Sequence, residues 1–440
     1  MNGGSLMNEK IGIITLGCKV NQYESEAFAE ALTSLGYEVC DPTEPCDAYI
    51  INTCTVTAEA DRKSKQMIRR AARAGKNAAV VVTGCTAEYS SKQLSEIDGV
   101  IAVCGNAKKL ECVKIIDEYF KKKESGYPVI KVEPIEEAGF EPMHLTGFPR
   151  TRVYIKIEDG CENRCAYCAI PGARGKVRSK APEDVLHEVE GFIKAGCREI
   201  VLTGIETASY GKDLDGVTLS ALLREVDAIA GDCKIRLGSL DPSLFRQRFV
   251  DGIKDLRSLA PHFHISLQSG SSSVLALMRR KYNAEGAKAA MDRIRAAIPG
   301  VMFTTDIIVG FPGETEESFN ETVEFVKAAR FLDAHIFPYS EREGTEAASM
   351  KDQVPVHVRR ERAARLIELQ SSIRDSILDE IVSGGAEVSV LFETCSDGVA
   401  QGHTDSFLAV AAESDRDLHG EIRKVKITSH KDGICLGVIR

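Results

Sequence analysis

The chain has 440 residues, 43% of them hydrophobic, which is enough for about two to four domains with proper cores. This composition excludes an intrinsically disordered chain. The formal net charge is −9, which argues against a surface that is basic all over for gripping nucleic acid. Any contact with nucleic acid must therefore come from local patches.

No stretch of the sequence approaches the ~18 consecutive apolar residues of a membrane span. The first ten residues lack the charged-then-apolar layout of a secretory signal. We therefore expect a soluble cytoplasmic protein without a membrane partner. The 14 cysteines are dilute in such a chain, so metal binding or catalysis explains them better than disulfides do.

Short apolar runs alternate with helical patterns in the first part of the chain. The runs span residues 11–17, 48–52, 78–84 and 100–105. This alternation predicts a doubly wound parallel sheet with helices on both faces, over residues 8–125. Residues 126–150 combine prolines and glycines with little periodicity, which predicts a linker.

Six further apolar runs with helical segments between them follow the linker. They span residues 152–159, 199–204, 234–240, 262–268, 302–310 and 333–340. Repeated units of this length predict a partial (β/α)6 barrel, which a long helix at 357–381 extends to residues 151–382. Short strands at 387–393, 406–412, 421–428 and 433–439 then predict a small oligonucleotide-binding β-barrel over 386–440. The predicted fold class is a multidomain α/β protein.

Three cysteines lie on one short segment directly after the first predicted barrel strand. They form the run Cys161-Glu-Asn-Arg-Cys165-Ala-Tyr-Cys168, a C-x3-C-x2-C spacing. Three thiolates on one loop bind three irons of a four-iron cluster, whose all-cysteine shell needs four, so one iron stays open. The amino and carboxylate groups of S-adenosylmethionine suit that iron, and electron transfer from the cluster then breaks the sulfonium bond.

A structural zinc site is the alternative explanation of these cysteines. It needs four closed tetrahedral ligands, and no histidine or fourth cysteine stands at zinc-like spacing nearby. The carboxyl end of a barrel strand is also the catalytic face of such folds. We therefore favour an iron–sulfur cluster.

Cys18, Cys54 and Cys85 each stand just past the end of a different predicted strand of the first sheet. The carboxyl edge of an open parallel sheet is where ligands bind, so we expect these three thiols to converge. A single buried cysteine is often an inert packing residue, but three at equivalent strand ends are harder to dismiss. The remaining cysteines have no paired spacing that indicates a site.

Residues 152–340 resemble the radical S-adenosylmethionine superfamily in further motifs. Thr203-Gly204-Ile205-Glu206 ends the second strand, where the superfamily places a Gly-Gly-Glu-like motif against the amino group of the cofactor. The run 306–310, followed by Phe-Pro-Gly-Glu, ends the fifth strand at the place that borders the adenine. The resemblance implies contacts with S-adenosylmethionine from Tyr167, Thr203, Gly204, Glu206, Ser266, Gln268, Asp306 and Gly310.

Nearly the whole chain resembles the methylthiotransferases within that superfamily. The segments that carry this resemblance are 16–26 (LGCKVNQYESE), 52–57 (NTCTVT), 82–85 (VTGC), 264–271 (HISLQSGS) and 278–282 (MRRKY). In that family Cys18, Cys54 and Cys85 hold an auxiliary four-iron cluster. The form Gly-Cys-Lys-Val-Asn-Gln is most similar to the branch that acts on N6-threonylcarbamoyladenosine beside the tRNA anticodon.

The resemblance implies methylthiolation of C2 of that base at tRNA position 37, with two S-adenosylmethionine molecules and two 4Fe-4S clusters. Its implied partners are the tRNA anticodon stem-loop, an external one-electron reductant and a sulfur donor. A methylthiotransferase for isopentenyladenosine or for a ribosomal protein residue remains an alternative. A non-catalytic zinc or RNA-binding protein is the second alternative.

Basic residues in three places are candidates for contacts with RNA phosphates. The richest stretch, residues 62–73, lies on a predicted helix that places Arg69 and Arg73 near one face, although a solvated helix face explains it as well. A second patch beyond the cysteine loop holds Arg174, Lys176 and Arg178. The C-terminal module resembles the small RNA-binding TRAM domain, where Arg423 and Lys424 are candidates despite an acidic surrounding charge.

Overall fold

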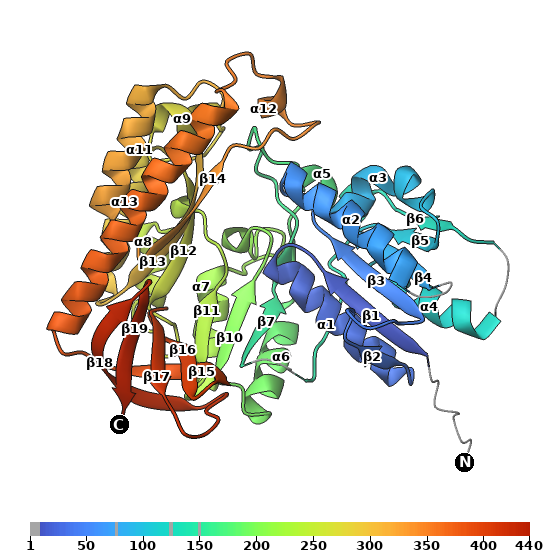
Figure 1. The fold of residues 1–440 in the computed structure, drawn as a ribbon, viewed down its shortest axis with the longest axis horizontal. Coiled ribbons are helices and arrows are strands. Elements are labelled where there is room, and N and C mark those ends of the chain that lie inside the picture. The colour runs from blue at the N-terminus through green and yellow to red at the C-terminus, as the bar shows by residue number, and fades with distance from the viewer. Residues whose placement is uncertain (1–8, 75–77, 123–125, 148–150) are drawn as a thin grey trace.

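The computed structural model describes residues 9–74, 78–122, 126–147 and 151–440 as three packed modules (Figure 1). The predicted domain boundaries at residues 8 and 125, and residues 148–150 of the predicted linker, lie outside the described residues. Within the described part, no helix is both long and apolar enough to cross a lipid bilayer.

The first module is a six-stranded parallel sheet in the order β2-β1-β3-β4-β5-β6. Its strands are β1 (Lys10–Thr15), β2 (Glu38–Cys40), β3 (Ala48–Thr53), β4 (Ala79–Gly84), β5 (Val100–Cys104) and β6 (Val129–Lys131). Its helices are α1 (Lys19–Ser34), α2 (Ala58–Ala74), α3 (Cys85–Ser95) and α4 (Glu111–Lys122). Every residue of β3 and β4 is buried, because helices cover both faces, and this explains their unbroken apolar runs.

The predicted linker is not a free connection. Residues 129–131 form β6, which pairs in parallel with β5 at the edge of the first sheet, and a 3-10 turn follows at Ile135–Glu137. Three residues are too few to show a strand period in the sequence, so β6 within the predicted linker 126–150 was not foreseen. The structure also pairs Cys40 with Cys46, which the sequence did not predict.

The second module is a barrel of six parallel strands in two halves, ordered β11-β10-β7 and β12-β13-β14. The strands are β7 (Arg152–Lys156), β10 (Glu199–Thr203), β11 (Lys234–Leu237), β12 (His262–Gln268), β13 (Met302–Val309) and β14 (Asp333–Pro338). Two isolated parallel bridges, from Ile235 to Leu259 and from Leu240 to Ile265, join the halves. The predicted partial (β/α)6 barrel is confirmed, and its six strands fall within the predicted runs.

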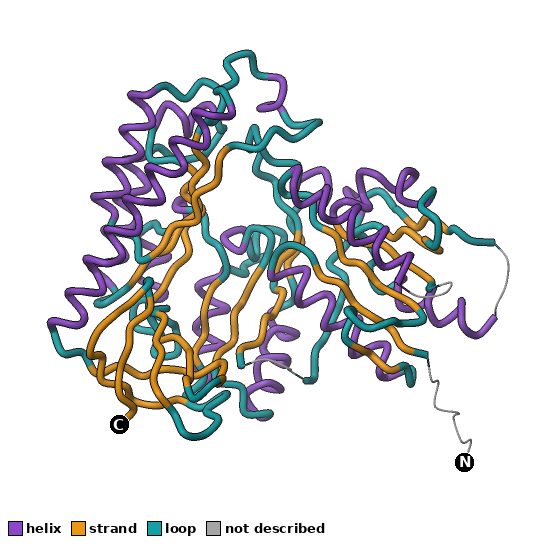
Figure 2. Tube along the Cα trace, viewed as in Figure 1, coloured by secondary structure: helices purple, strands orange, loops and turns teal. Residues whose placement is uncertain are grey.

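Helices line the outer side of the barrel, as Figure 2 shows most clearly for the two long helices α11 and α13. The helices are α5 (Ile170–Arg174), α6 (Pro182–Lys194), α7 (Leu219–Ala230), α8 (Gln247–Ile253), α9 (Ser272–Leu277), α10 (Ala284–Ala297), α11 (Glu316–Ala329), α12 (Glu346–Ser349) and α13 (Val356–Ser383). Two 3-10 turns, Thr207–Ser209 and Pro242–Leu244, and a short hairpin of β8 (Glu158–Asp159) and β9 (Arg178–Ser179) complete the module.

The third module is a closed barrel in the order β15-β16-β17-β19-β18. Its strands are β15 (Glu387–Ser396), β16 (Val399–Thr404), β17 (Ala409–Glu413), β18 (Ile422–Lys431) and β19 (Ile434–Ile439). The predicted β-barrel is confirmed, although the sequence did not predict β16, whose VAQGHT run is too polar to read as a strand. Ile377 and Leu378 of α13 share the core of this barrel, so α13 fixes it to the second module.

One continuous apolar core runs through the first two modules, from Ile11 and Phe28 to Ile155 and Phe263. Phe263 lies at its centre, fully buried, with its ring centroid 5.4 Å from that of Phe245 and 6.4 Å from that of Phe303. The barrel therefore depends on aromatic packing at this point.

We expect Phe263→Ala to lower the free energy of unfolding by about 3–5 kcal/mol, because it removes buried surface and leaves a cavity. Urea unfolding followed by circular dichroism measures the change. The matched control is Phe337→Ala, since that ring on β14 is 48% exposed and its loss costs less than about 1 kcal/mol. Equal losses in the two variants would contradict the packing described here.

Candidate active site

The three cysteines of the first module stand at one edge of its sheet. Thr15 pairs with Asn52, and Thr53 pairs with Gly84, so β1, β3 and β4 end in register. Cys18 is the N-cap residue of α1, Cys54 follows β3, and Cys85 begins α3. The chain leaves β1 toward β2 on one side and has β3 on the other, so this edge contains the switch point of the sheet, where ligands bind.

The thiols of this first triad lie close enough together for their charges to interact. Burial, together with the charges of Cys85 and Cys18, raises the pKa of Cys54 to about 11. Burial also raises the pKa of Cys18, where Cys85 adds to the shift and the Arg174 guanidinium opposes it. Three thiols in such an environment favour a bound cation, because a metal removes the cost of ionising them together.

The loop of the second triad presents backbone and side-chain donors to its sulfurs. The backbone N–H groups of Asn163 and Ile170 donate to Sγ of Cys161 and of Cys168, at 3.4 Å each. Arg280 donates from Nη1 to Sγ of Cys165 at 3.1 Å. Hydrogen bonds of this kind stabilise thiolates and tune an iron–sulfur cluster.

Arg280 is itself held in place by three further contacts. Its guanidinium donates to Asp241 at 2.8 Å, to the Ser266 carbonyl at 3.1 Å and to the Tyr282 hydroxyl at 3.0 Å. Arg280 and Tyr282 belong to the MRRKY segment, whose chemical role the sequence did not indicate. Ser266 was predicted at the cofactor, and the structure joins it to the cysteine loop through this arginine.

The two triads face each other across the junction of the first and second modules. The pKa of Cys168 is raised to about 11, mainly by burial, and the charge of Cys85 from the first triad contributes to that rise. The hydroxyl of Tyr89, on α3, donates to the carbonyl of Ala169, the residue after the second triad. Sulfur ligands from two modules are thereby brought to one place.

A glycine with a left-handed backbone precedes one or more cysteines of each triad. Gly17, Gly84 and Gly160 have φ values of 101°, 94° and 87°. A Cβ on Gly84 would lie 2.4 Å from the Thr53 carbonyl oxygen, and one on Gly160 would lie 1.9 Å from the Lys176 carbonyl oxygen. Only glycine fits such a backbone conformation against another chain segment, so these residues aim the thiols that follow them.

The thiols fit a multi-iron cluster better than a single metal ion. In the described residues, no group of three or more His, Cys, Asp or Glu side chains is arranged to hold one metal ion. A four-iron cluster requires a different arrangement of ligands, because each of its thiolates binds a separate iron. Two groups of three mutually interacting thiols, one with an arginine donor, meet that requirement.

A buried ion cluster lies beside the first triad and corrects one prediction. Arg174 has no exposed surface; its guanidinium contacts Glu24 of α1 at 2.8 Å, Asp159 at 3.2 Å and the Asn21 side chain at 2.6 Å. Arg178 is buried as well, 3.6 Å from Asp159. The prediction that Arg174 and Arg178 contact RNA phosphates was wrong, because both guanidinium groups are buried in ion pairs.

The motif at the end of β10 meets the cysteine loop. Glu206 accepts a hydrogen bond from the Asn163 side chain at 3.0 Å, and its backbone N–H donates to Glu158 at 2.7 Å. Gly204 lies against Glu158, since a Cβ there would be 2.5 Å from the Glu158 carboxylate. Thr203 is buried and lines the cavity described below together with Gly204.

The other predicted cofactor residues lie on three separate walls. Tyr167 packs edge-on against Phe311, with ring centroids 6.3 Å apart. Gln268 ends β12 with a φ of 68°, at an irregularity in the pairing with β13. Gly310 directly follows β13 and packs under Arg359 of α13, where a Cβ would meet Cγ at 2.4 Å.

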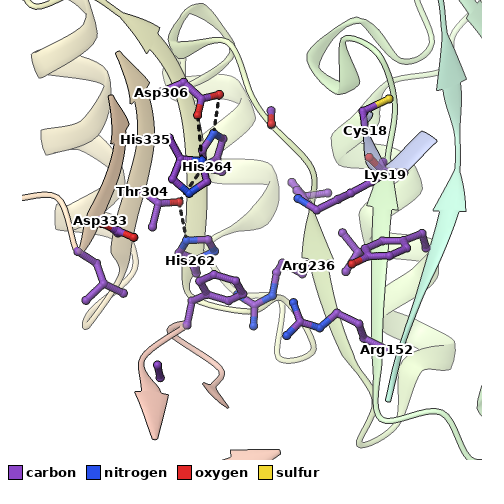
Figure 3. A pocket seen from close by; sticks show the side chains of 18 of the residues that line it. Cys18, Lys19, Arg152, Arg236, His262, His264, Thr304, Asp306, Asp333 and His335 are labelled. Atoms are coloured by element: carbon purple, nitrogen blue, oxygen red, sulfur yellow. Dashed lines mark hydrogen bonds and ion pairs between the residues drawn. The ribbon is translucent and has the colours of Figure 1, made fainter. Parts of the chain in front are cut away.

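A cavity of about 1010 Å³ lies where the three modules meet (Figure 3). The first module contributes Cys18 and Cys54, the second contributes strand residues from both halves of its barrel, and the third contributes Phe407. Asp306 stands on one wall, paired with His264 at 3.2 Å and His335 at 3.5 Å. Burial raises the pKa of Asp306, but the two histidines outweigh it and hold that pKa below its usual value.

Three cations line the opposite side of this cavity, and sequence reasoning did not identify them as functional. They are Lys19 at the start of α1, Arg152 on β7 and Arg236 on β11 (Figure 3). Arg152 and Arg236 share Glu199, at 3.5 Å and 2.8 Å. Of the three, only Lys19 could have been identified from the sequence, because it directly follows Cys18.

The remaining basic candidates differ in exposure. Arg69 and Arg73 are exposed on α2, and Lys176 and Lys424 are exposed as well. Arg423 is partly buried and paired with Glu421. The structure therefore leaves Arg69, Arg73, Lys176 and Lys424 accessible to a large ligand.

Two segments of the chain match known families. Residues 155–326 match the radical SAM superfamily, and residues 10–105 match the uncharacterized protein family UPF0004. The solved structure of the radical S-adenosylmethionine methyltransferase TsrM from Kitasatospora setae has a TM-score of 0.56 and 17% identity, covering 91% of this chain and 82% of that one. Together with the second triad, the superfamily match defines a radical S-adenosylmethionine enzyme.

Similar proteins indicate which family within this class the chain belongs to. The threonylcarbamoyladenosine tRNA methylthiotransferase MtaB of Bacillus subtilis is 40% identical over 419 residues, covering 94% of this chain and 92% of that protein. MtaB of Thermotoga maritima is 38% identical, covering 95% and 94%. The tRNA-2-methylthio-N(6)-dimethylallyladenosine synthase of Carboxydothermus hydrogenoformans is 35% identical, covering 95% and 96%. The chain belongs to the radical S-adenosylmethionine tRNA methylthiotransferases, which confirms the predicted family and its iron–sulfur and S-adenosylmethionine cofactors.

We expect Gly160→Ala to lower the iron bound after anaerobic reconstitution by about half, because the new Cβ collides with the Lys176 carbonyl and turns Cys161 away. Gly300→Ala is the matched control, since Gly300 also has a positive φ, 74°, but nothing lies within 4 Å of a Cβ there. Iron is measured by colorimetric assay. Full iron content in the Gly160 variant would show that the glycine does not aim the loop.

The pKa of Glu206 predicts how the free energy of unfolding depends on pH. This pKa is raised from 4.5 to about 7, mainly by burial, with Asp241 contributing to the rise and Arg280 opposing it. The folded protein therefore binds more protons than the unfolded chain between those pH values, so its free energy of unfolding falls as pH rises through that window. We expect Glu206→Gln to remove on the order of 3 kcal/mol of this fall, measured by urea unfolding at pH 4.5 and 7.5. The same pH dependence in both proteins would contradict the assignment.

Proposed function

We propose that this protein methylthiolates C2 of N6-threonylcarbamoyladenosine at position 37 of tRNA, within the anticodon stem-loop, in the cytoplasm. The observation that carries the proposal is the meeting of two cysteine triads from two modules, the first of which lines a cavity wide enough for a modified base. Relatives named for this substrate are 38–40% identical over most of the chain. This likeness favours the substrate over its alternatives.

We assign one four-iron cluster to Cys161, Cys165 and Cys168 and an auxiliary one to Cys18, Cys54 and Cys85. When bound, these clusters and S-adenosylmethionine supply the electron, the carbon radical and the site of sulfur delivery. Tyr167, Thr203, Gly204, Glu206, Ser266, Gln268, Asp306 and Gly310 remain the proposed contacts of S-adenosylmethionine.

The chain's own residues position these groups and protect them. Asn163 holds Glu206 beside the cysteine loop, so a carboxylate stands ready to accept a hydrogen bond from an amino group. Arg280 places a positive charge on Cys165 and thereby stabilises the ligand as a thiolate. Ala166, inside the cysteine loop, packs with Val274 and Phe311 in a buried apolar cluster, which limits the access of water on this side of the second triad and so protects a carbon radical from side reactions.

The proposal includes three partners beyond the small cofactors. An external one-electron reductant and a sulfur donor are needed, because the chain's own side chains supply neither electrons nor sulfur for repeated turnovers. The tRNA is expected to contact Lys176 beside the second triad, Arg69 and Arg73 on α2 and Lys424 on the C-terminal barrel, all of which are exposed. Arg423 is a weaker candidate because Glu421 already neutralises it.

The test is anaerobic incubation of the reconstituted enzyme with S-adenosylmethionine, a reductant, a sulfide source and tRNA. One tRNA sample carries threonylcarbamoyladenosine and another carries dimethylallyladenosine, the base named for the Carboxydothermus relative. Mass spectrometry of the digested nucleosides measures the products. We expect a methylthio product from the first sample, and a product from the second sample alone would refute the assigned substrate.

Variants test the cluster assignment separately from the substrate. Two four-iron clusters correspond to about eight irons per chain, so Cys161→Ala and Cys18→Ala should each retain about four. Cys161→Ala should also abolish reductive cleavage of S-adenosylmethionine to 5′-deoxyadenosine. Cys395→Ala is the control, because this partly exposed cysteine lies on β15 and is expected to keep all eight. If the Cys161 variant still cleaved S-adenosylmethionine, the assignment of a cluster to Cys161, Cys165 and Cys168 would be wrong.

A further inference from the structure

The cationic side of the cavity contains donors that no described residue satisfies. Arg236 is only 3% exposed, yet its Nη1 has no hydrogen-bond partner, and the same holds for Nδ1 of His262, which is 4% exposed. Lys19 makes no hydrogen bond or ion pair with any residue that the structure describes. Buried donors in proteins nearly always have partners, so these indicate a missing acceptor.

An aromatic ring from the C-terminal barrel orders these groups. Phe407 has a φ of 72° and lies under the guanidinium groups of Arg236 and Arg152, 4.9 Å and 5.5 Å from its centroid. His262 stacks on the same ring at 4.6 Å. Such stacking fixes the direction in which the arginines present their free N–H groups.

The charges on this side act on one another through the cavity. Burial lowers the pKa of His262, and the charges of Arg236 and Lys19 lower it further. His262 is therefore neutral at pH 7 and can donate from one ring nitrogen while the other contacts Thr304 at 3.0 Å. A negatively charged ligand group placed here would meet two cations and one neutral donor.

We propose that Lys19, Arg236 and His262 form a subsite for the carboxylate of the threonylcarbamoyl group, an inference that rests on the proposed function. In adenine, the ring nitrogen N1 is flanked by C2 and by C6, the carbon that carries the exocyclic N6. A base whose C2 faces the Cys18 triad therefore carries its N6 substituent toward the residue next to Cys18, which is Lys19. Charge-assisted hydrogen bonds to a carboxylate are among the strongest that proteins make.

The same subsite disfavours a neutral substituent. A dimethylallyl group offers no acceptor, so binding it would cover Lys19 and the free Nη1 of Arg236 without giving either of them a hydrogen bond. Sites built to bind a polar group reject analogues that lack it far more strongly than apolar pockets reject extra atoms. The subsite would thus separate two substrates that share the reacting carbon.

The test measures binding by the reconstituted enzyme with fluorescently labelled anticodon stem-loop RNAs. One RNA carries threonylcarbamoyladenosine and a second carries its methyl ester, which lacks the charge and is larger by one methyl group. We expect the acid to bind roughly tenfold or more tightly than the ester, which corresponds to one charged hydrogen bond. Equal affinities of wild-type enzyme for acid and ester would overturn the subsite whatever any variant does.

Lys19→Gln should reduce the ratio of ester to acid dissociation constants by roughly tenfold. This residue is the better target, because replacing Arg236 would strand its ion-pair partner Glu199. Lys92→Gln, on α3 and outside the cavity, removes the same charge from the chain and should keep the wild-type ratio. An unchanged ratio in the Lys19 variant, or an equal fall in the Lys92 variant, would contradict the subsite.

Nucleoside analysis keeps this result distinct from the proposed function. If wild-type enzyme forms the methylthio product but binds acid and ester equally, the function stands and the subsite is wrong. If it binds the acid selectively but forms no methylthio product, the subsite stands as a binding site for a carboxylate-bearing RNA and the assigned reaction is wrong.

Discussion

The structure depends on a buried group of charges between the first two modules. Glu24 of α1 accepts ion pairs from Lys109, from Lys156 at 3.2 Å and from Arg174 at 2.8 Å, and each of these four side chains has at most 2% exposure. Burial raises the pKa of Glu24, but the three cations outweigh it and hold that pKa well below its usual value. Removing one member would leave a charge buried alone, which is costly, so the group fixes how the modules meet. Because Arg174 follows the second triad and Glu24 lies in the helix that begins after Cys18, this contact also fixes one triad relative to the other.

The geometry of the cavity depends on this junction between the first two modules. Its walls belong to three modules, and each contributes a different property: sulfur from the first, strand ends and histidines from the second, and an aromatic ring from the third. A parallel sheet and a parallel barrel both present ligands at the carboxyl ends of their strands. When the two folds are joined edge to edge, those ends face a common space, and chemistry that needs two metal centres at short range becomes possible.

The sequence predicted most of the fold because its strands are long and apolar. The six barrel strands and the four inner strands of the first sheet each carry enough apolar residues to show their type. β2, β6 and β16 were missed because they are short or polar and exist through pairing with a neighbour. The cysteines were visible from spacing alone, whereas Arg174 resembled a surface cation, since nothing local indicates that Glu24, 150 residues away, buries it. Lys19, Arg236 and His262 come from three elements, and their common cavity depends on tertiary structure.

The position of Phe407 gives the C-terminal barrel a second role. The ring reaches out of that barrel into the cavity, where His262 and two arginines rest on it. Arg152 also pairs with Glu393 at 2.6 Å, and His403 bridges Glu393 and Glu199. The barrel thus serves as a wall of the reaction chamber in addition to any role as an RNA clamp. Swapping this module between related enzymes would therefore transplant part of the substrate pocket along with it.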